Sequence, residues 1–214
     1  MLDEKVLLYL GSLEYKQDQT AILEMEKFAK QTGVPIMEKM GFDFVRQILK
    51  LRKPKMILEI GSAIGYSAIR MALEAPNSMI YTIEKDIERY NIAVNNIKNF
   101  KLENQITIIN ADALNKNQII EDVNQFDLIF IDAAKGKNKE FFELYEEKLA
   151  PNGIIITDNV LFKGIVASPE NATKRIKPMI NKIREYNEWL KNNPNYDTAI
   201  YPIGDGVALS IRKG

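Results

Sequence analysis

Residues 56–74 read MILEIGSAIGYSAIRMALE. The first five residues are apolar except for Glu59, which predicts a buried β-strand. Gly61 and Gly65 allow the backbone to turn sharply, and residues 66–74 then carry apolar side chains at helical spacing. A strand that passes through a glycine turn into a helix is typical of α/β folds.

The segments that follow repeat this alternation of strand and helix. Short apolar runs predict strands at residues 56–60, 79–83, 106–109, 128–131 and 154–157. Helical spacing predicts helices at residues 66–74, 87–99, 117–122, 138–149 and 172–191. The last of these helices contains Pro178, which predicts an interruption there. Because the strands lack a polar face, we expect a parallel sheet that is covered by helices on both sides.

Both ends of the chain depart from this alternation. Residues 198–202 and 207–212 flank Gly204-Asp205-Gly206, which predicts a closing β-hairpin. Amphipathic helices are predicted before the sheet, at residues 2–13, 19–32 and 42–51. The expected fold class is α/β, a doubly wound and mostly parallel seven-stranded sheet with N-terminal helices and a C-terminal antiparallel hairpin. We expect one domain over residues 1–214, with a helical cap at 1–52 whose apolar surface favours a homodimer.

Composition narrows the possible chemistry. The 214 residues include no cysteine and no histidine, which excludes thiolate chemistry, Ser-His-Asp catalysis and histidine-bound zinc. Any metal must be bound by oxygen, as Mg²⁺, Ca²⁺ and Mn²⁺ are. The 29 basic and 29 acidic residues cancel, so no global field attracts nucleic acid. No apolar run is long enough to span a membrane, and the first residues lack a secretory pattern, so we expect a cytoplasmic protein.

The glycine turn points to a particular kind of ligand. Its G-x-x-x-G spacing differs from the G-x-G-x-x-G of pyrophosphate-binding turns, although both glycines could serve only the turn itself. A ligand without phosphates is favoured, such as the amino-acid part of S-adenosylmethionine (SAM), with Glu59 placed to bind its ammonium group. Glu84 follows the second strand, where a carboxylate can bind ribose hydroxyls. Asp112 follows the third strand and could bind an adenine amino group, or cap a helix that begins near Leu114.

Polar residues also end the fourth and fifth strands. Asp132 follows one of them and Asp158-Asn159 ends the other, so these residues should be neighbours at the carboxyl edge of the sheet. Two carboxylates and an amide oxygen suit Mg²⁺, although Asp-Asn alone is also a common turn. Lys135 lies three residues past Asp132. A nearby dication disfavours its ammonium form, so it could act as a general base, or it could simply be a surface lysine.

Six segments together resemble a known family, and they read LEIGSAIGYS, YTIEKD, NADAL, FIDAAKGKN, LAPNGIIITDNVLFKG and IGDGVALSIRK. In this order they resemble the metal-dependent O-methyltransferases related to catechol and caffeoyl-coenzyme A O-methyltransferases, which have the Rossmann-like class I fold. The resemblance implies that Asp132, Asp158 and Asn159 bind Mg²⁺ and that Lys135 and Asp132 act in catalysis. It further implies that SAM is surrounded by Met37, Glu59, Gly61, Ser67, Glu84, Asp112, Ala113 and Asp132. Ala134 stands where the family often has aspartate, a departure that leaves the ligand set intact.

Within this family, the chain is similar to the bacterial enzymes that methylate 5-hydroxyuridine at the wobble position of tRNA, giving 5-methoxyuridine. This similarity implies a tRNA anticodon loop as the substrate. Its phosphates could be contacted by four basic residues, Arg46, Lys163, Lys174 and Arg175. Two alternatives remain, a methyltransferase of small catechols or phenols and a non-catalytic RNA- or protein-binding domain. Catechol and 5-hydroxyuridine each offer two adjacent oxygens, so the metal site alone does not choose between them.

Overall fold

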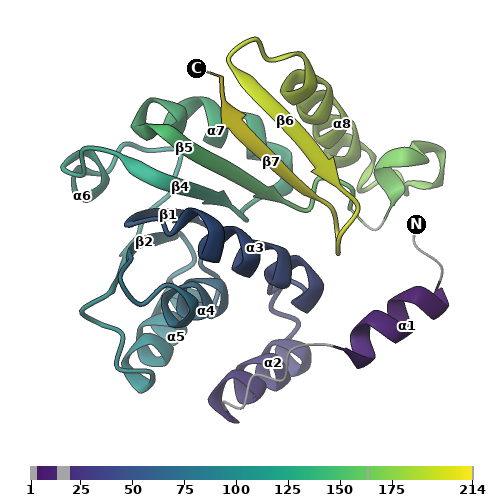
Figure 1. The fold of residues 1–214 in the computed structure, drawn as a ribbon. Helices are drawn as coiled ribbons and strands as arrows, with labels where there is room; N and C mark the ends of the chain where they lie inside the picture. The colour runs from purple at the N-terminus through teal and green to yellow at the C-terminus, as the bar shows by residue number, and fades with distance from the viewer. Residues whose placement is uncertain (1–3, 14–19, 163, 214) are drawn as a thin grey trace.

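The computed structural model describes residues 4–13, 20–162 and 164–213. Within these residues the strands form one seven-stranded sheet of order β3-β2-β1-β4-β5-β7-β6 (Figure 1). The strands are β1 (Met56–Ile60), β2 (Met79–Glu84), β3 (Ile106–Asn110), β4 (Phe126–Ile131), β5 (Leu149–Asp158), β6 (Tyr196–Tyr201) and β7 (Val207–Arg212). The first five strands are parallel, and β7 is antiparallel to both β5 and β6. The predicted fold class is confirmed, including the closing hairpin.

Helices connect the strands and precede them. They are α1 (Glu4–Ser12), α2 (Thr20–Thr32), α3 (Lys39–Arg52), α4 (Tyr66–Glu74), α5 (Ile87–Asn99), α6 (Gln118–Glu121), α7 (Asn138–Tyr145) and α8 (Lys177–Asn192). Short 3-10 helices lie at η1 (Lys135–Lys137), η2 (Glu146–Lys148), η3 (Ile165–Ala167) and η4 (Pro169–Asn171). None of the helices in the described ranges is long and apolar enough to cross a membrane.

Side chains on alternate faces of the sheet enter two separate cores. In β1, Ile57 packs with α2, α3 and α4, whereas Leu58 and Ile60 pack with α7 and α8 on the opposite face. Phe42 of α3 is fully buried in the first core and Phe142 of α7 in the second. The sheet is therefore covered on both sides, as the apolar strands predicted. Helix α1 lies apart from the sheet (Figure 1).

Several boundaries differ from those predicted, and two of the differences have a clear physical reason. The predicted helix at 138–149 ends at Tyr145, and β5 begins at Leu149 because Leu149 pairs with Phe126 of β4. The prediction of an interruption at Pro178 is wrong, because α8 begins at Lys177 and the proline lies in its first turn. The first N–H groups of a helix have no partner within it, so proline loses nothing there.

Candidate active site

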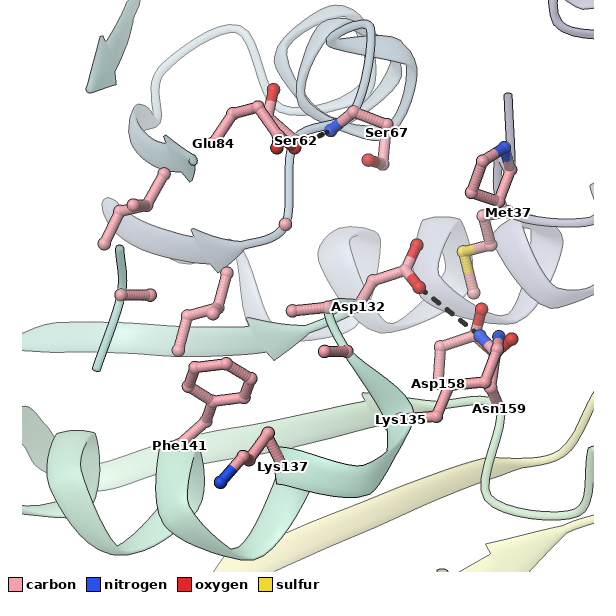
Figure 2. Close-up of a pocket in the computed structure, with 18 of the residues that line it drawn as sticks. Met37, Ser62, Ser67, Glu84, Asp132, Lys135, Lys137, Phe141, Asp158 and Asn159 are labelled. Atoms are coloured by element: carbon pink, nitrogen blue, oxygen red, sulfur yellow. Dashed lines mark hydrogen bonds between the residues drawn. The ribbon is translucent and has the colours of Figure 1, made fainter. Parts of the chain in front are cut away.

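A cavity of about 550 Å³ opens at the carboxyl ends of β1, β2, β4 and β5. Ten of the predicted site residues line it, namely Met37, Gly61, Ser67, Glu84, Asp112, Ala113, Asp132, Lys135, Asp158 and Asn159. Figure 2 labels all of these except Gly61, Asp112 and Ala113. Glu59, Arg46, Lys174 and Arg175 are not among the lining residues, and Lys163 lies outside the described residues. The structure therefore gathers the candidate metal ligands, the candidate general base and all but one of the candidate donor-binding residues in one place. The candidate RNA-binding residues that it describes lie outside the cavity.

The glycine turn is pressed against the end of β4. Gly61 has a φ of +97°, and a Cβ atom there would lie 2.2 Å from the carbonyl oxygen of Asp132. The N–H groups of Gly61 and Ser62 donate to the carbonyl of Ile83 at 3.0 and 3.2 Å. Only glycine fits this backbone conformation and this close approach. The resulting turn forms the wall of the cavity between β1 and α4.

Glu84 is held in place by backbone donors at the end of β2. One carboxylate oxygen accepts from the N–H of Ala63 and the other from the N–H of Asp86, both at 2.8 Å. The residue is only 7% exposed, yet it lines the cavity. Each carboxylate oxygen can accept more than one hydrogen bond. Glu84 can therefore still bind a pair of ligand hydroxyls, as the sequence predicted for a ribose.

Glu59 lies behind the cavity wall. Its carboxylate is fully buried and accepts hydrogen bonds from the hydroxyls of Ser67 and Thr82. Burial raises the pKa of Glu59 to about 7, and the two hydroxyls oppose this rise only in part. Ser67 lines the cavity in its place. Direct contact between Glu59 and an ammonium group stays a prediction, and in this structure the Glu59 carboxylate is reached through Ser67, which lines the cavity.

Asp112 and Ala113 form the edge of the cavity beyond β3. The carboxylate of Asp112 accepts from the N–H of Leu114 at 3.0 Å, and the segment forms a turn rather than the start of a helix. The hydroxyl of Tyr145 donates to the carbonyl of Ala113 at 2.8 Å, which fixes this turn against α7. Asp112 is exposed, so its other oxygen can accept from a bound ligand.

The carboxylates of Asp132 and Asp158 lie together with Asn159 at the ends of β4 and β5 (Figure 2). The side-chain nitrogen of Asn159 donates to Asp132 at 3.3 Å, and Asp158 is 6% exposed. Burial raises the pKa of Asp132 well above its usual range, and the charge of Asp158 raises it further. Burial also raises the pKa of Asp158, to about 6. Two neighbouring carboxylates, one of which opposes the ionisation of the other, form a site suited to a cation.

The kind of cation that this site could bind depends on which side chains would coordinate it. Within the described residues, no group of three or more His, Cys, Asp or Glu side chains is arranged to hold a metal ion. The third candidate ligand is instead the amide of Asn159, which would present its oxygen after a rotation that exchanges oxygen and nitrogen. Lys135 of η1 lines the same cavity, and its charge lowers the pKa of both aspartates. Its Nζ atom lies 5.4 Å from the ring centroid of Phe162.

Two further acidic residues were missed by the sequence analysis. Glu38, at the start of α3, and Asp205, in the β6–β7 turn, both line the cavity and raise the pKa of Asp158. The Gly-Asp-Gly motif signalled only a turn, because nothing local indicated that this turn reaches the cavity. The carbonyl of Asp205 accepts from the N–H groups of Leu161 and Phe162, both at 2.9 Å, which ties the hairpin to the loop after β5.

Comparisons with known proteins agree with this geometry. A family model described as O-methyltransferase matches residues 13–213. The catechol O-methyltransferase of Niastella koreensis is 32% identical over 98% of this chain and 97% of its own. A Staphylococcus aureus protein provisionally described as a caffeoyl-CoA O-methyltransferase has 36% identity, a TM-score of 0.87 and full coverage of both chains. An O-methyltransferase from Bacillus cereus, solved with S-adenosylhomocysteine (SAH), has 25% identity, a TM-score of 0.81 and coverage of 98% and 97%.

These similarities extend over nearly the whole chain and include the turn and strand ends that form the cavity. The matching family and the named relatives are O-methyltransferases, which argues against a non-catalytic binding domain. The chain belongs to the O-methyltransferase family and is a SAM-dependent O-methyltransferase.

Proposed function

We propose that this enzyme transfers the methyl group of SAM to the 5-hydroxyl of 5-hydroxyuridine at the wobble position of tRNA. The observation that carries the choice of acceptor is a basic segment beside the cavity. Residues 171–184 include five basic residues and no acidic one. A phosphate backbone is the acceptor feature that such a segment suits, because phosphate contacts position nucleic acids on proteins.

The basic segment lies at the cavity because α8 packs against η1. Met179 of α8 lines the cavity, and Lys182 of α8 packs beside Gly136 of η1. Exposed bases surround this contact, namely Lys174, Arg175, Lys177 and Lys182. None of the four makes a salt bridge with a carboxylate of a described residue. An RNA strand that crosses this rim could place one extruded base in the cavity.

Arg46 contributes less than the sequence suggested. Its side chain is only 14% exposed and forms an ion pair with Asp43 at 3.2 Å, within α3. An arginine that is already paired with a carboxylate is less available to bind a phosphate. The proposed RNA contacts therefore rest on the residues that precede α8 and on its first turns.

The cavity fits SAM through the features that the glycine turn provides. The close approach of Gly61 to the backbone of Asp132 shapes the cavity wall, and Glu84 keeps acceptor positions for a ribose. Asp112 can accept from an adenine amino group at the opposite edge. Ser67 and Met37 line the remaining wall and would face the amino-acid end of the donor.

The acidic site fits Mg²⁺, with Asp132, Asp158 and Asn159 as its ligands. Bound there, the cation would lower the pKa of the acceptor hydroxyl and fix its orientation. Lys135, which shares the cavity with both aspartates, would take the proton from that hydroxyl. The acceptor oxygen then forms a bond to the methyl carbon while the carbon–sulfur bond breaks, which leaves SAH and a neutral ether.

A small catechol is the second candidate acceptor. It is favoured by the named activity of the Niastella koreensis relative, which is a catechol O-methyltransferase. Catechol presents two adjacent oxygens, as 5-hydroxyuridine does with its hydroxyl and O4 carbonyl. The two acceptors differ in charge, so the rate of methylation should depend steeply on salt for tRNA and little for catechol.

The experiment that tests the proposal offers both acceptors to one enzyme. Methyl-labelled SAM and Mg²⁺ are incubated with the protein and either tRNA that carries 5-hydroxyuridine or catechol. We expect label in the wobble nucleoside of the tRNA, and a loss of labelling as salt rises. Label in catechol alone would replace the proposed acceptor with the second one.

The proposal also covers how the enzyme assembles and where in the cell it acts. The N-terminal helical region exposes apolar side chains, among them Tyr9 of α1, Leu13 directly after α1 and Leu23 of α2, at 63%, 61% and 53%. Two copies of the chain that pair through this surface would bury it, which is the expected homodimer. A tRNA acceptor would place the enzyme in the cytoplasm.

A further inference from the structure

Two consecutive residues of α8 contact the chain on either side of the candidate metal ligands. The pair Asp158-Asn159 stands at the end of β5. Directly before the pair, the hydroxyl of Thr157 is hydrogen-bonded to the hydroxyl of Tyr186 at 2.8 Å, and both residues are buried. Directly after it, the carbonyl of Val160 accepts from the side-chain nitrogen of Asn187 at 2.7 Å. Helix α8 therefore holds the residue before the pair and the residue after it.

The backbone that follows the pair depends on contacts from other elements. Asn159 has a φ of +65°, a left-handed conformation that is uncommon outside glycine and is kept where the surroundings fix it. Val160 is fully buried, and its N–H donates to the carbonyl of Gly206 at 3.0 Å. Its carbonyl accepts from Asn187. The hairpin thus fixes one peptide group of Val160, and α8 fixes the other.

The side chain of Asn187 is oriented by this loop and not by its own helix. Its nitrogen donates to Val160, whereas its Oδ1 atom is buried and has no hydrogen-bond partner among the described residues. Asn192, on the same helix, is exposed and donates to the carbonyl of Glu188 within α8. A buried amide oxygen without a partner is unfavourable for stability. The contact of Asn187 with Val160 therefore serves the loop at Asn159 more than it serves α8.

We propose that Asn187 and Tyr186 are positioning residues of the enzyme, which hold the candidate metal ligands in the geometry that a cation requires. Asn187 acts on Asn159 through the backbone of Val160, and Tyr186 acts on Asp158 through Thr157. Neither α8 residue lines the cavity. Groups that orient metal ligands from behind commonly change metal affinity by about tenfold or more. The inference rests on the Mg²⁺ site of the proposed function.

Loss of either contact should weaken the binding of Mg²⁺ and leave the binding of SAH unchanged. Asn187→Ala removes the hydrogen bond to Val160, so Asn159 is held less firmly and the Kd for Mg²⁺ should rise about tenfold. Tyr186→Phe keeps the buried ring and removes only the hydroxyl, so it should raise this Kd by a smaller factor. The Kd for SAH should stay the same, because most of the candidate donor-binding residues lie at the ends of β1, β2 and β3.

Arg184 provides a matched control on the same helix. Its Nη1 atom donates to the carbonyl of Val166 at 2.7 Å, which lies farther along the same loop from Asn159. Arg184→Met removes a side-chain hydrogen bond of the same kind, so its Tm should fall to a similar extent as that of Asn187→Ala. Its Kd for Mg²⁺ should equal that of the wild type. An Asn187 that only stabilised the fold would resemble Arg184 in both measurements.

The experiment is a calorimetric titration of the SAH-bound protein with Mg²⁺, together with the Tm and the Kd for SAH, for the wild type and the three variants. A higher Kd for Mg²⁺ in Asn187→Ala supports the proposal if the Kd for SAH and the Mg²⁺ affinity of Arg184→Met stay at the wild-type values. A Kd for Mg²⁺ within twofold of the wild type overturns it. An equal weakening in Arg184→Met also overturns it.

Two further outcomes are distinguishable. If Asn187→Ala does not fold, Tyr186→Phe decides, because a higher Kd for Mg²⁺ in this variant supports the proposal and a wild-type value overturns it. If the wild type binds no Mg²⁺, the metal site of the proposed function is wrong and the inference is overturned with it. Equal binding of Mg²⁺ by the wild type and Asn187→Ala refutes the positioning role alone.

Discussion

The side-chain nitrogen of Asn159 lies 3.3 Å from a carboxylate oxygen of Asp132, although the two residues are 27 positions apart. They meet because β4 and β5 are adjacent parallel strands and both residues lie at their carboxyl ends. Asn159 has a φ of +65°, a conformation that asparagine tolerates better than most residues, and this turns the chain out of β5 beside Asp132. The metal site proposed for this enzyme depends on this meeting point.

The turn at Gly61 should tolerate no side chain. Gly61→Ala places a Cβ atom 2.2 Å from the carbonyl oxygen of Asp132 at a positive φ, so the variant should lose about 3 kcal/mol or more of stability and most SAH binding. Gly33 also has a positive φ, but a Cβ there meets no atom within 4 Å. Gly33→Ala should therefore cost only about 1 kcal/mol. Urea unfolding of both variants checks the difference, and equal losses would show that the contact with Asp132 is not what excludes a side chain.

The buried carboxyl of Glu59 should make stability depend on pH. Because its pKa is raised from 4.5 to about 7, the folded state holds the proton more tightly than the unfolded state. The protonated carboxyl therefore adds to the free energy of unfolding. This contribution is complete below pH 4.5 and is lost as pH rises through 7, with a total of about 3 kcal/mol. Glu59→Gln should remove this loss, so the variant gains stability relative to the wild type between pH 5 and pH 8.5. Glu185→Gln, at an exposed site of α8, serves as the control, and parallel pH curves for wild type and Glu59→Gln would refute the assignment.

Lys135 should contribute most to kcat at pH values at which the acceptor hydroxyl keeps its proton. Lys135→Ala is expected to lower kcat by about 10²-fold or more near pH 7 and by less at alkaline pH, where the acceptor hydroxyl ionises unaided. Lys139, which is exposed and forms an ion pair with Glu143 at 3.5 Å, provides the control variant Lys139→Ala. The measurement is a pH profile of kcat for the three proteins. A uniform loss at every pH would assign Lys135 a role other than proton removal.

The exposed bases beside the cavity, which are Lys174, Arg175, Lys177 and Lys182, should affect the methylation of tRNA and leave the methylation of catechol unchanged. Arg175→Glu combined with Lys182→Glu should lower kcat/KM for tRNA at least tenfold and reduce its dependence on salt, because phosphate contacts are lost. Lys27→Glu combined with Lys98→Glu makes the same charge change on exposed sites of α2 and α5. Methylation of each acceptor is measured over a range of salt. If both double variants weaken tRNA methylation equally, the rim has no special role.

The sequence predicted most of the sheet because its strands are short apolar runs with no polar face. Those strand ends also located Asp132 and Asp158, since parallel strands bring their carboxyl ends to one edge. What the sequence could not show was contact between distant segments. The approach of Asp205 to the cavity depends on how the hairpin packs on the loop after β5, and the seclusion of Glu59 depends on Ser67 and Thr82. The start of β5 was missed for the same reason, because it is set by pairing with Phe126.

The most direct test of the metal-centred account is a calorimetric titration of the SAH-bound enzyme with Mg²⁺, for the wild type and for Asp158→Ala. The wild type should bind one Mg²⁺ per chain, and Asp158→Ala should bind none while retaining its affinity for SAH and its fold. Methyl transfer should disappear in the variant and, for the wild type, in the presence of a chelator. Transfer that persists in either case would contradict the account, because Asp132 and Asp158 would then serve some purpose other than holding a cation.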